Sequence, residues 1–193
     1  MNMPEGSSDL LNELITALRR NGIEYIVVGG QAIAEEVPVM TQDLDVMVAL
    51  RNFDRAVAQL GREPAFGTEE RKSWIARWEV QGGATPLKTD VDLLNGQPYC
   101  GSMSPDDFFD YIRERWTVTG RLGLTARPPV VWYTRFLAVG FWGAYAVKVM
   151  RDIRAGAPRT WFDGVREIAN RTGTSRTIAE RIAWVEDALR PDP

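Results

Sequence analysis

Two aspartates stand one residue apart at the start of an apolar run. Asp43 and Asp45 flank Leu44, and Val46 to Ala49 continue the run. Because side chains alternate across a strand, both carboxylates would point to the same side. Like charges repel and are costly to desolvate, so a bound divalent cation is the simplest reason to keep them there. Carboxylate oxygens suit Mg²⁺, which completes its shell with water and substrate phosphates. The pair therefore predicts a magnesium site.

A glycine pair precedes the aspartates and could bind phosphate. Gly29 and Gly30 follow a short apolar, β-prone run, 25–28. The segment after them, 31–37, can form about two helical turns before Pro38 ends it. Free N–H groups at the start of a helix attract phosphate. The sequence predicts a strand, a tight turn and a short helix that would hold the phosphates of a nucleotide.

A third carboxylate is expected on another strand. Residues 71–80 alternate as a strand does, 81–84 form a turn, and 87–94 form the next strand, so we expect an antiparallel pair. Asp90 and Asp92 share one face of that second strand. Asp92 lies inside the apolar run and is the preferred third metal ligand, whereas Asp90, nearer the start, remains the alternative.

These segments, in this order, resemble the signature of the DNA-polymerase-β-like nucleotidyltransferase superfamily. Val28-Gly29-Gly30 is followed by a spacer, by Asp43-Leu44-Asp45-Val46, and later by Val91-Asp92-Leu93-Leu94. The resemblance implies an α+β fold in which helices flank a small mixed β-sheet and a C-terminal helical subdomain follows. We place the nucleotidyltransferase catalytic domain at 1–127 and the helical subdomain at 128–193, because Pro128-Pro129 marks a boundary before a long helical stretch.

The resemblance also implies an activity, in which a nucleoside monophosphate passes from a nucleoside triphosphate such as ATP to an acceptor hydroxyl. Two Mg²⁺ ions would assist. Asp43 and Asp45 would hold the ion that carries the β- and γ-phosphates. Those two and Asp92 would hold the second ion, and Gly29 and Gly30 would hold the triphosphate.

Lys148 is a candidate for the same site because it lies on a strongly apolar helix face. An unpaired ammonium is costly there, so Lys148 either reaches the surface or points into the cleft toward phosphate. Lys148 followed by Arg151 or Arg154 resembles a motif of the AbiEii-type toxin nucleotidyltransferases. The segment that should carry the next part of that motif, 159–163, does not match it and keeps only Asp163.

Composition excludes several classes of site. Hydrophobic residues make up 45% of the chain and charged residues 25%, as in ordinary globular proteins. The absence of histidine excludes histidine-based triads and zinc sites with histidine ligands. One cysteine, Cys100, excludes an internal disulfide and is typical of a cytoplasmic protein. We expect no signal peptide and no membrane span, because the most apolar run, 136–147, is too short.

Charge is distributed unevenly along the chain. Residues 1–120 carry 19 acidic and 11 basic side chains, and 121–193 carry 7 and 12. The basic half favours a toxin-type enzyme that modifies RNA, such as the 3′ end of tRNA, with a cognate antitoxin as partner. It could equally be a solvated helical surface. A small-molecule transferase acting on an aminoglycoside, or a module of this fold that binds nucleotide without catalysis, remain alternatives.

Periodicity and caps predict the helices. An apolar stripe and Asn21-Gly22 define the first, and Ser104-Pro105 is a strong start for another. The helices expected in addition to 31–37 are 7–20, 52–60, 108–116, 132–155, 159–170 and 174–189, with a turn or short hairpin at 117–127.

Overall fold

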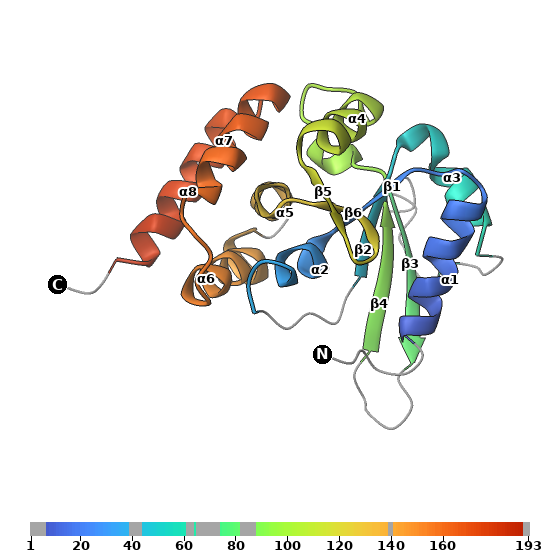
Figure 1. Ribbon diagram of the computed structural model, residues 1–193. Helices are drawn as coiled ribbons and strands as arrows, with labels where there is room; N and C mark the ends of the chain where they lie inside the picture. Colours follow the sequence, from blue (N-terminus) through green and yellow to red (C-terminus); the bar gives the residue numbers. More distant parts are fainter. Residues whose placement is uncertain are drawn as a thin grey trace.

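The protein is an α+β structure built on one six-stranded mixed sheet, as predicted (Figure 1). The computed structural model describes residues 7–38, 44–60, 64, 74–81, 88–138 and 141–190. Among these residues, no helix is both long enough and apolar enough to span a membrane.

The strands of the sheet lie in the order β3-β4-β2-β1-β6-β5. β2 is parallel to β4, β1 is parallel to β6, and the other neighbours are antiparallel. The expected antiparallel pair is therefore confirmed as β3 and β4, and the expected hairpin as β5 and β6. The strands are β1 (Tyr25–Val28), β2 (Leu44–Val48), β3 (Ile75–Gln81), β4 (Lys88–Leu94), β5 (Thr117–Gly120) and β6 (Gly123–Ala126).

Helices flank the sheet. Side chains of α1 and α3 join a core with one face of the sheet, and those of α2 and α4 to α8 join a second core with the other face. The helices are α1 (Ser7–Arg20), α2 (Gly29–Ala34), α3 (Leu50–Ala58), α4 (Pro105–Arg115), α5 (Pro128–Leu137), α6 (Ala146–Arg154), α7 (Trp161–Thr172) and α8 (Ser175–Ala188), with a 3₁₀ turn, η1 (Gln97–Tyr99).

Strand alternation decides which face carries the aspartates. In β2, Leu44 and Val46 belong to the core shared with α1, whereas Met47 belongs to the core shared with the C-terminal helices. Asp45 alternates with Leu44 and Val46, so it lies on the same face as Met47. The candidate metal site is therefore on the face that the C-terminal helices cover.

The sheet and the C-terminal helices share that second core. Val28 of β1 and Met47 of β2 belong to the same buried cluster as Phe136 of α5, Phe162 of α7 and Ile182 of α8. α5 begins at Pro128, before the start predicted at 132, and both prolines lie in its first turn. The division into two domains at this point remains a prediction.

The predicted single helix over 132–155 is wrong. α5 ends at Leu137, where Ala138 has an extended backbone with ψ 143°, and a π-helical turn, η2 (Phe141–Tyr145), precedes α6. Within η2, Gly143 has φ −102° and ψ −115°, outside the helical region. A residue without Cβ adopts such a conformation readily, so the chain bends where apolar periodicity alone suggested continuity.

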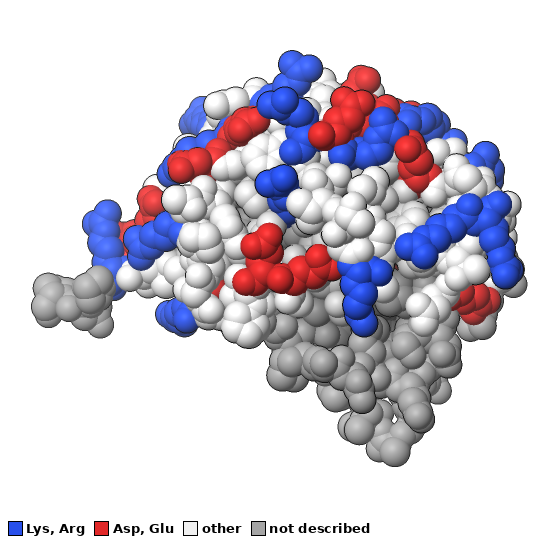
Figure 2. Space-filling view, viewed as in Figure 1, with Lys and Arg blue, Asp and Glu red and all other residues white. Residues whose placement is uncertain are grey.

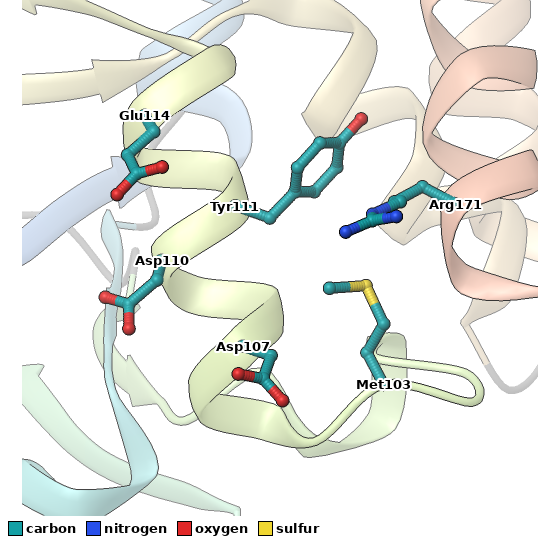
Figure 3. A pocket seen from close by; sticks show the side chains of 6 residues that line it. All are labelled: Met103, Asp107, Asp110, Tyr111, Glu114 and Arg171. Carbon is teal, nitrogen blue, oxygen red and sulfur yellow. The ribbon is translucent and has the colours of Figure 1, made fainter.

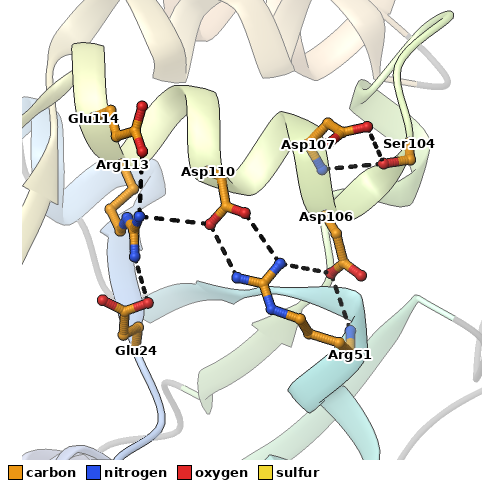
Figure 4. Close-up of polar contacts among 8 residues, drawn as sticks. All are labelled: Glu24, Arg51, Ser104, Asp106, Asp107, Asp110, Arg113 and Glu114. Carbon is orange, nitrogen blue, oxygen red and sulfur yellow. Dashed lines mark hydrogen bonds and ion pairs between the residues drawn. The ribbon is translucent and has the colours of Figure 1, made fainter.

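Ion pairs tie α4 to the N-terminal part of the fold (Figure 4). Arg51 contacts Asp106 at 3.5 Å and Asp110 at 3.0 Å, and Arg113 pairs with Glu24. These groups are partly exposed, so each pair contributes little, about 0.2–1 kcal/mol. The predicted start of α4 is confirmed, and the structure adds its N-cap bond, in which the Ser104 hydroxyl accepts from the backbone N–H of Asp107 at 3.1 Å.

Candidate active site

The glycine turn and the metal-motif strand are in direct contact. Gly29 has φ +67°, a left-handed conformation that favours glycine, and α2 begins there. A Cβ added to Gly29 would lie 1.7 Å from Oδ2 of Asp45, so only glycine leaves room for the carboxylate. Strand pairing causes this contact, because Val28 is opposite Asp45 in the β1–β2 register. Gly30 follows in the first turn of α2 and is half-buried.

Two candidate carboxylates lie side by side on neighbouring strands. Asp45 of β2 is paired in register with Asp92 of β4, so the two side chains share one face of the sheet. Asp45 is half-buried, and Asp92 is 5% exposed. Asp43 lies outside the described residues. The structure thus brings together Gly29, Asp45 and Asp92, which are spread over more than 60 residues of the sequence.

Arg77 forms a bidentate ion pair with Asp92, which we did not predict from the sequence. Its Nε donates to Oδ1 of Asp92 at 2.7 Å and its Nη2 to Oδ2 at 2.6 Å. The β3–β4 register places the two residues directly opposite one another. Alternation in β3 could have indicated that Arg77 shares a face with Ile75, but only the register of the hairpin selects Asp92 as its partner.

The described residues fit a metal ion only in part. Among them, no group of three His, Cys, Asp or Glu side chains could hold one. Asp45 is the carboxylate that a hard cation would contact beside the glycine turn, with Asp43 as the predicted second ligand. Asp92 has both oxygens bonded to Arg77, so a cation at Asp92 would have to compete with the guanidinium. The predicted third ligand is thus already paired in the described part of the structure.

Tyr99, which is also absent from the sequence prediction, interacts electrostatically with the aspartates. Burial raises the pKa of Tyr99, and the charges of Asp45 and Asp92 raise it further. Tyr145 of η2 contributes to the same shift. The Nζ of Lys148 lies 5.4 Å from the centre of the Tyr145 ring. Lys148 is half-buried and is linked to this group through Tyr145.

A buried ion pair fixes α6, and Arg151 belongs to it. Asp152 is fully buried and accepts from Arg135, from Nε1 of Trp132 at 3.1 Å, and from Nη2 of Arg151 at 3.0 Å. Burial lowers the pKa of Arg135, while the charges of Asp152 and Asp45 oppose that shift. The candidate substrate-binding Arg151 is thus exposed at one side and anchored by Asp152 at the other.

An acidic hollow of about 460 Å³ lies elsewhere, between α4 and α7 (Figure 3). Asp107 in it accepts from the Ser104 hydroxyl, and Asp110 accepts from Arg51. None of the lining residues belongs to the group around Asp45, so the hollow is separate from the candidate active site. The lining residues are Met103, Asp107, Asp110, Tyr111, Glu114 and Arg171.

Surface charge does not divide cleanly into an acidic and a basic half. On the face drawn in Figure 2, basic and acidic side chains are interspersed over the helices as well as over the sheet. The C-terminal helices pair several of their arginines with acidic neighbours, including Arg166 with Asp163 and Arg176 with Glu180. These local pairs offset part of the positive charge of the second half.

Comparisons with known proteins add a structural likeness and no sequence match. No family model matches the chain, and no curated protein matches it. Three solved structures resemble it over most of its length. A putative nucleotidyltransferase from Helicobacter pylori has 7% identity and a TM-score of 0.48, with 94% of each chain covered.

The second is a putative nucleotidyltransferase from Thermotoga maritima, with 14% identity and a TM-score of 0.41, over 84% of this chain and 96% of the other. The third is ANT(2″)-Ia in complex with adenylyl-2″-tobramycin, with 12% identity and a TM-score of 0.40, over 95% of this chain and 99% of the other.

Proposed function

We propose that this chain is a nucleotidyltransferase that transfers a nucleoside monophosphate from a nucleoside triphosphate to an acceptor hydroxyl. One observation carries the proposal: the left-handed Gly29 turn packs against the carboxylate of Asp45, and Asp92 is its neighbour on the next strand. A backbone that approaches a carboxylate this closely places free N–H groups and hard oxygen ligands together, which is the combination that a metal-bound triphosphate requires.

We assign the following roles in the reaction to residues of this chain. The N–H groups of Gly29 and Gly30 hold the phosphates. Asp45, with Asp43, would hold Mg²⁺, which when bound neutralises phosphate charge and activates the attacking hydroxyl. Lys148 adds positive charge near the pyrophosphate that leaves. The acceptor oxygen attacks the α-phosphorus in line, the bond to the bridging oxygen breaks, and the acceptor proton passes to solvent or to a site carboxylate.

For the acceptor we propose RNA, such as a tRNA 3′ end, with a cognate antitoxin as regulator in the cytoplasm. The surplus of arginine after Gly120 supports an anionic acceptor. An aminoglycoside-like acceptor would instead need acidic groups beside the site. The acidic hollow between α4 and α7 does not supply them, because its residues lie apart from the Asp45 group.

A second candidate is a module of this fold that binds nucleotide without transferring it. The pairing of both Asp92 oxygens with Arg77 favours this alternative, since a ligand set of three carboxylates is then incomplete. The two candidates share nucleotide binding at the glycine turn and differ in turnover.

One assay tests the transferase proposal. Purified protein is incubated with Mg²⁺, each labelled nucleoside triphosphate in turn, and either total tRNA or an aminoglycoside. We expect label on RNA from the wild type and none from Asp45→Asn. Asp54→Asn is the matched control, because it neutralises an exposed aspartate on α3 and should not alter transfer. Nucleotide binding without labelled product on either acceptor would reject the transferase in favour of the binding module.

A further inference from the structure

We propose that Arg77 competes with divalent cations for Asp92 and stands in for the second of the two ions expected at this site. The proposal rests on the proposed nucleotidyltransferase site, and it changes the expected ion count. It predicts one divalent ion, held near Asp45, where the three-carboxylate pattern predicts two.

The geometry of the pair supports a substitute cation. A guanidinium fork that meets both carboxylate oxygens at 2.7 and 2.6 Å is a strong, charge-assisted arrangement. It also uses the oxygens that a metal ion would need. Arg77 is opposite Asp92 on one side, and Asp45 is opposite it on the other, so Asp92 lies between the guanidinium and the second carboxylate.

Burial makes the pair costly to separate. The Asp92 side chain is 7% exposed, and that of Arg77 is 31% exposed. A carboxylate so far from water needs a counter-charge at all times, and removing one partner of such a pair leaves the other uncompensated. A metal ion that binds Asp92 must compete with Arg77 for the carboxylate oxygens.

A metal titration tests the competition directly. Free Mn²⁺ is counted by electron paramagnetic resonance during titration of the protein without nucleotide or acceptor. We expect wild type to bind one ion, and Arg77→Met to bind a second or to bind the first at least about tenfold more tightly, because Asp92 is released. Arg77→Lys, which keeps the charge but loses the fork, should fall between the two.

Two further variants assign the effect to Asp92. Adding Asp92→Asn to Arg77→Met should cancel the gain in Mn²⁺ binding. Arg113→Met is the matched control, because that arginine is also partly buried and paired with carboxylates, but with Glu24 and Asp110. It should not change Mn²⁺ binding.

Several outcomes would overturn the proposal. These are unchanged or weaker Mn²⁺ binding in Arg77→Met, a gain in Arg77→Met that Asp92→Asn does not cancel, or no Mn²⁺ binding by any variant. If Arg77→Met does not fold, Arg77→Lys, alone and combined with Asp92→Asn, still decides. The titration contains no substrate, so a protein that shows the competition but transfers no nucleotide would reject the proposed function and leave this inference standing.

Discussion

Arg135 of α5 and Asp152 of α6 form an ion pair inside the protein, with side chains only 7% and 0% exposed. The indole of Trp132 donates to the same Asp152 oxygen at 3.1 Å. This pair joins the two helices on either side of the break at Ala138, so it determines where α6, with Lys148 and Arg151, lies relative to the sheet.

Asp152→Ala should therefore lower the free energy of unfolding by about 3–5 kcal/mol, because it leaves Arg135 buried and unpaired. The double variant Arg135→Met, Asp152→Leu should recover most of that loss, since two apolar side chains need no counter-charge. Chemical denaturation of the three proteins measures the difference. Equal losses in the single and double variants would contradict this role.

Gly29→Ala should be far more damaging than Gly22→Ala. Both glycines have positive φ, +67° and +62°, so alanine is strained at each by about 1–2 kcal/mol. Nothing lies within 4 Å of a Cβ at Gly22, whereas a Cβ at Gly29 meets the Asp45 carboxylate. The difference in thermal unfolding temperature between the two variants measures the effect of the clash, because the backbone strain is common to both. Adding Asp45→Ala to Gly29→Ala removes the two nearest atoms and should restore part of the stability, which a strain-only effect would not allow.

Lys148→Met should weaken nucleoside triphosphate binding about tenfold, or about 1.4 kcal/mol, and leave the fold stable. Methionine keeps an apolar stem of similar length but loses the charge and its interaction with the Tyr145 ring. Isothermal titration with a non-hydrolysable triphosphate measures the affinity. Arg166→Met, an exposed cation on α7, is the control. Equal affinities in wild type and Lys148→Met would remove Lys148 from the site.

Arg151→Gln together with Arg154→Gln should reduce the salt dependence of RNA binding. If each arginine neutralises one phosphate of a single strand, the slope of log affinity against log salt falls by about 0.7 per residue. Glutamine retains a donor for Asp152, so the buried cluster stays satisfied. Arg176→Gln with Arg190→Gln on or near α8 serves as the comparison. The same slope in both double variants would argue against RNA contacts at α6.

Tyr99→Phe should make the protein more resistant to alkali. Burial and the nearby aspartates raise the pKa of Tyr99 in the folded state above its unfolded value of about 10. The stability that neutral Tyr99 gives the folded state is fully present below the unfolded pKa. It is lost as the pH rises above that pKa, because the phenol ionises first in the unfolded chain. The wild type should therefore lose more stability than Tyr99→Phe between about pH 9.5 and 11. Parallel pH profiles would show that the pKa of Tyr99 is not raised in the folded protein.

The sequence could predict the parts of this site that depend on local pattern. A glycine pair after an apolar run and an aspartate in the next strand are recognisable because each belongs to one element. The parallel pairing that brings Asp92 beside Asp45 was not predicted, because the resemblance to a family implied only that Asp92 belongs to the same site. Most helices lie within two residues of their expected bounds, because caps and apolar stripes are local signals as well.

Other parts depend on long-range contacts that no pattern encodes. Arg77 meets Asp92 only through the register of β3 and β4, and Tyr99 is held from α5, where the hydroxyl of Tyr133 donates to its carbonyl oxygen. Asp152 lies within an apolar helix, but nothing local identifies Arg135, 17 residues earlier, as its partner. The break after Leu137 was missed because apolar periodicity continues across it.

The alternation of β2 also limits the direction from which a ligand can arrive. Met47 and Leu94 come two residues after Asp45 and Asp92 on the same face, and they are only 2% and 8% exposed. The C-terminal helices therefore block the approach over the face of the sheet beyond the aspartates. Under the proposed function, a bound triphosphate would therefore lie toward the side of the two aspartates where β2 and β4 begin.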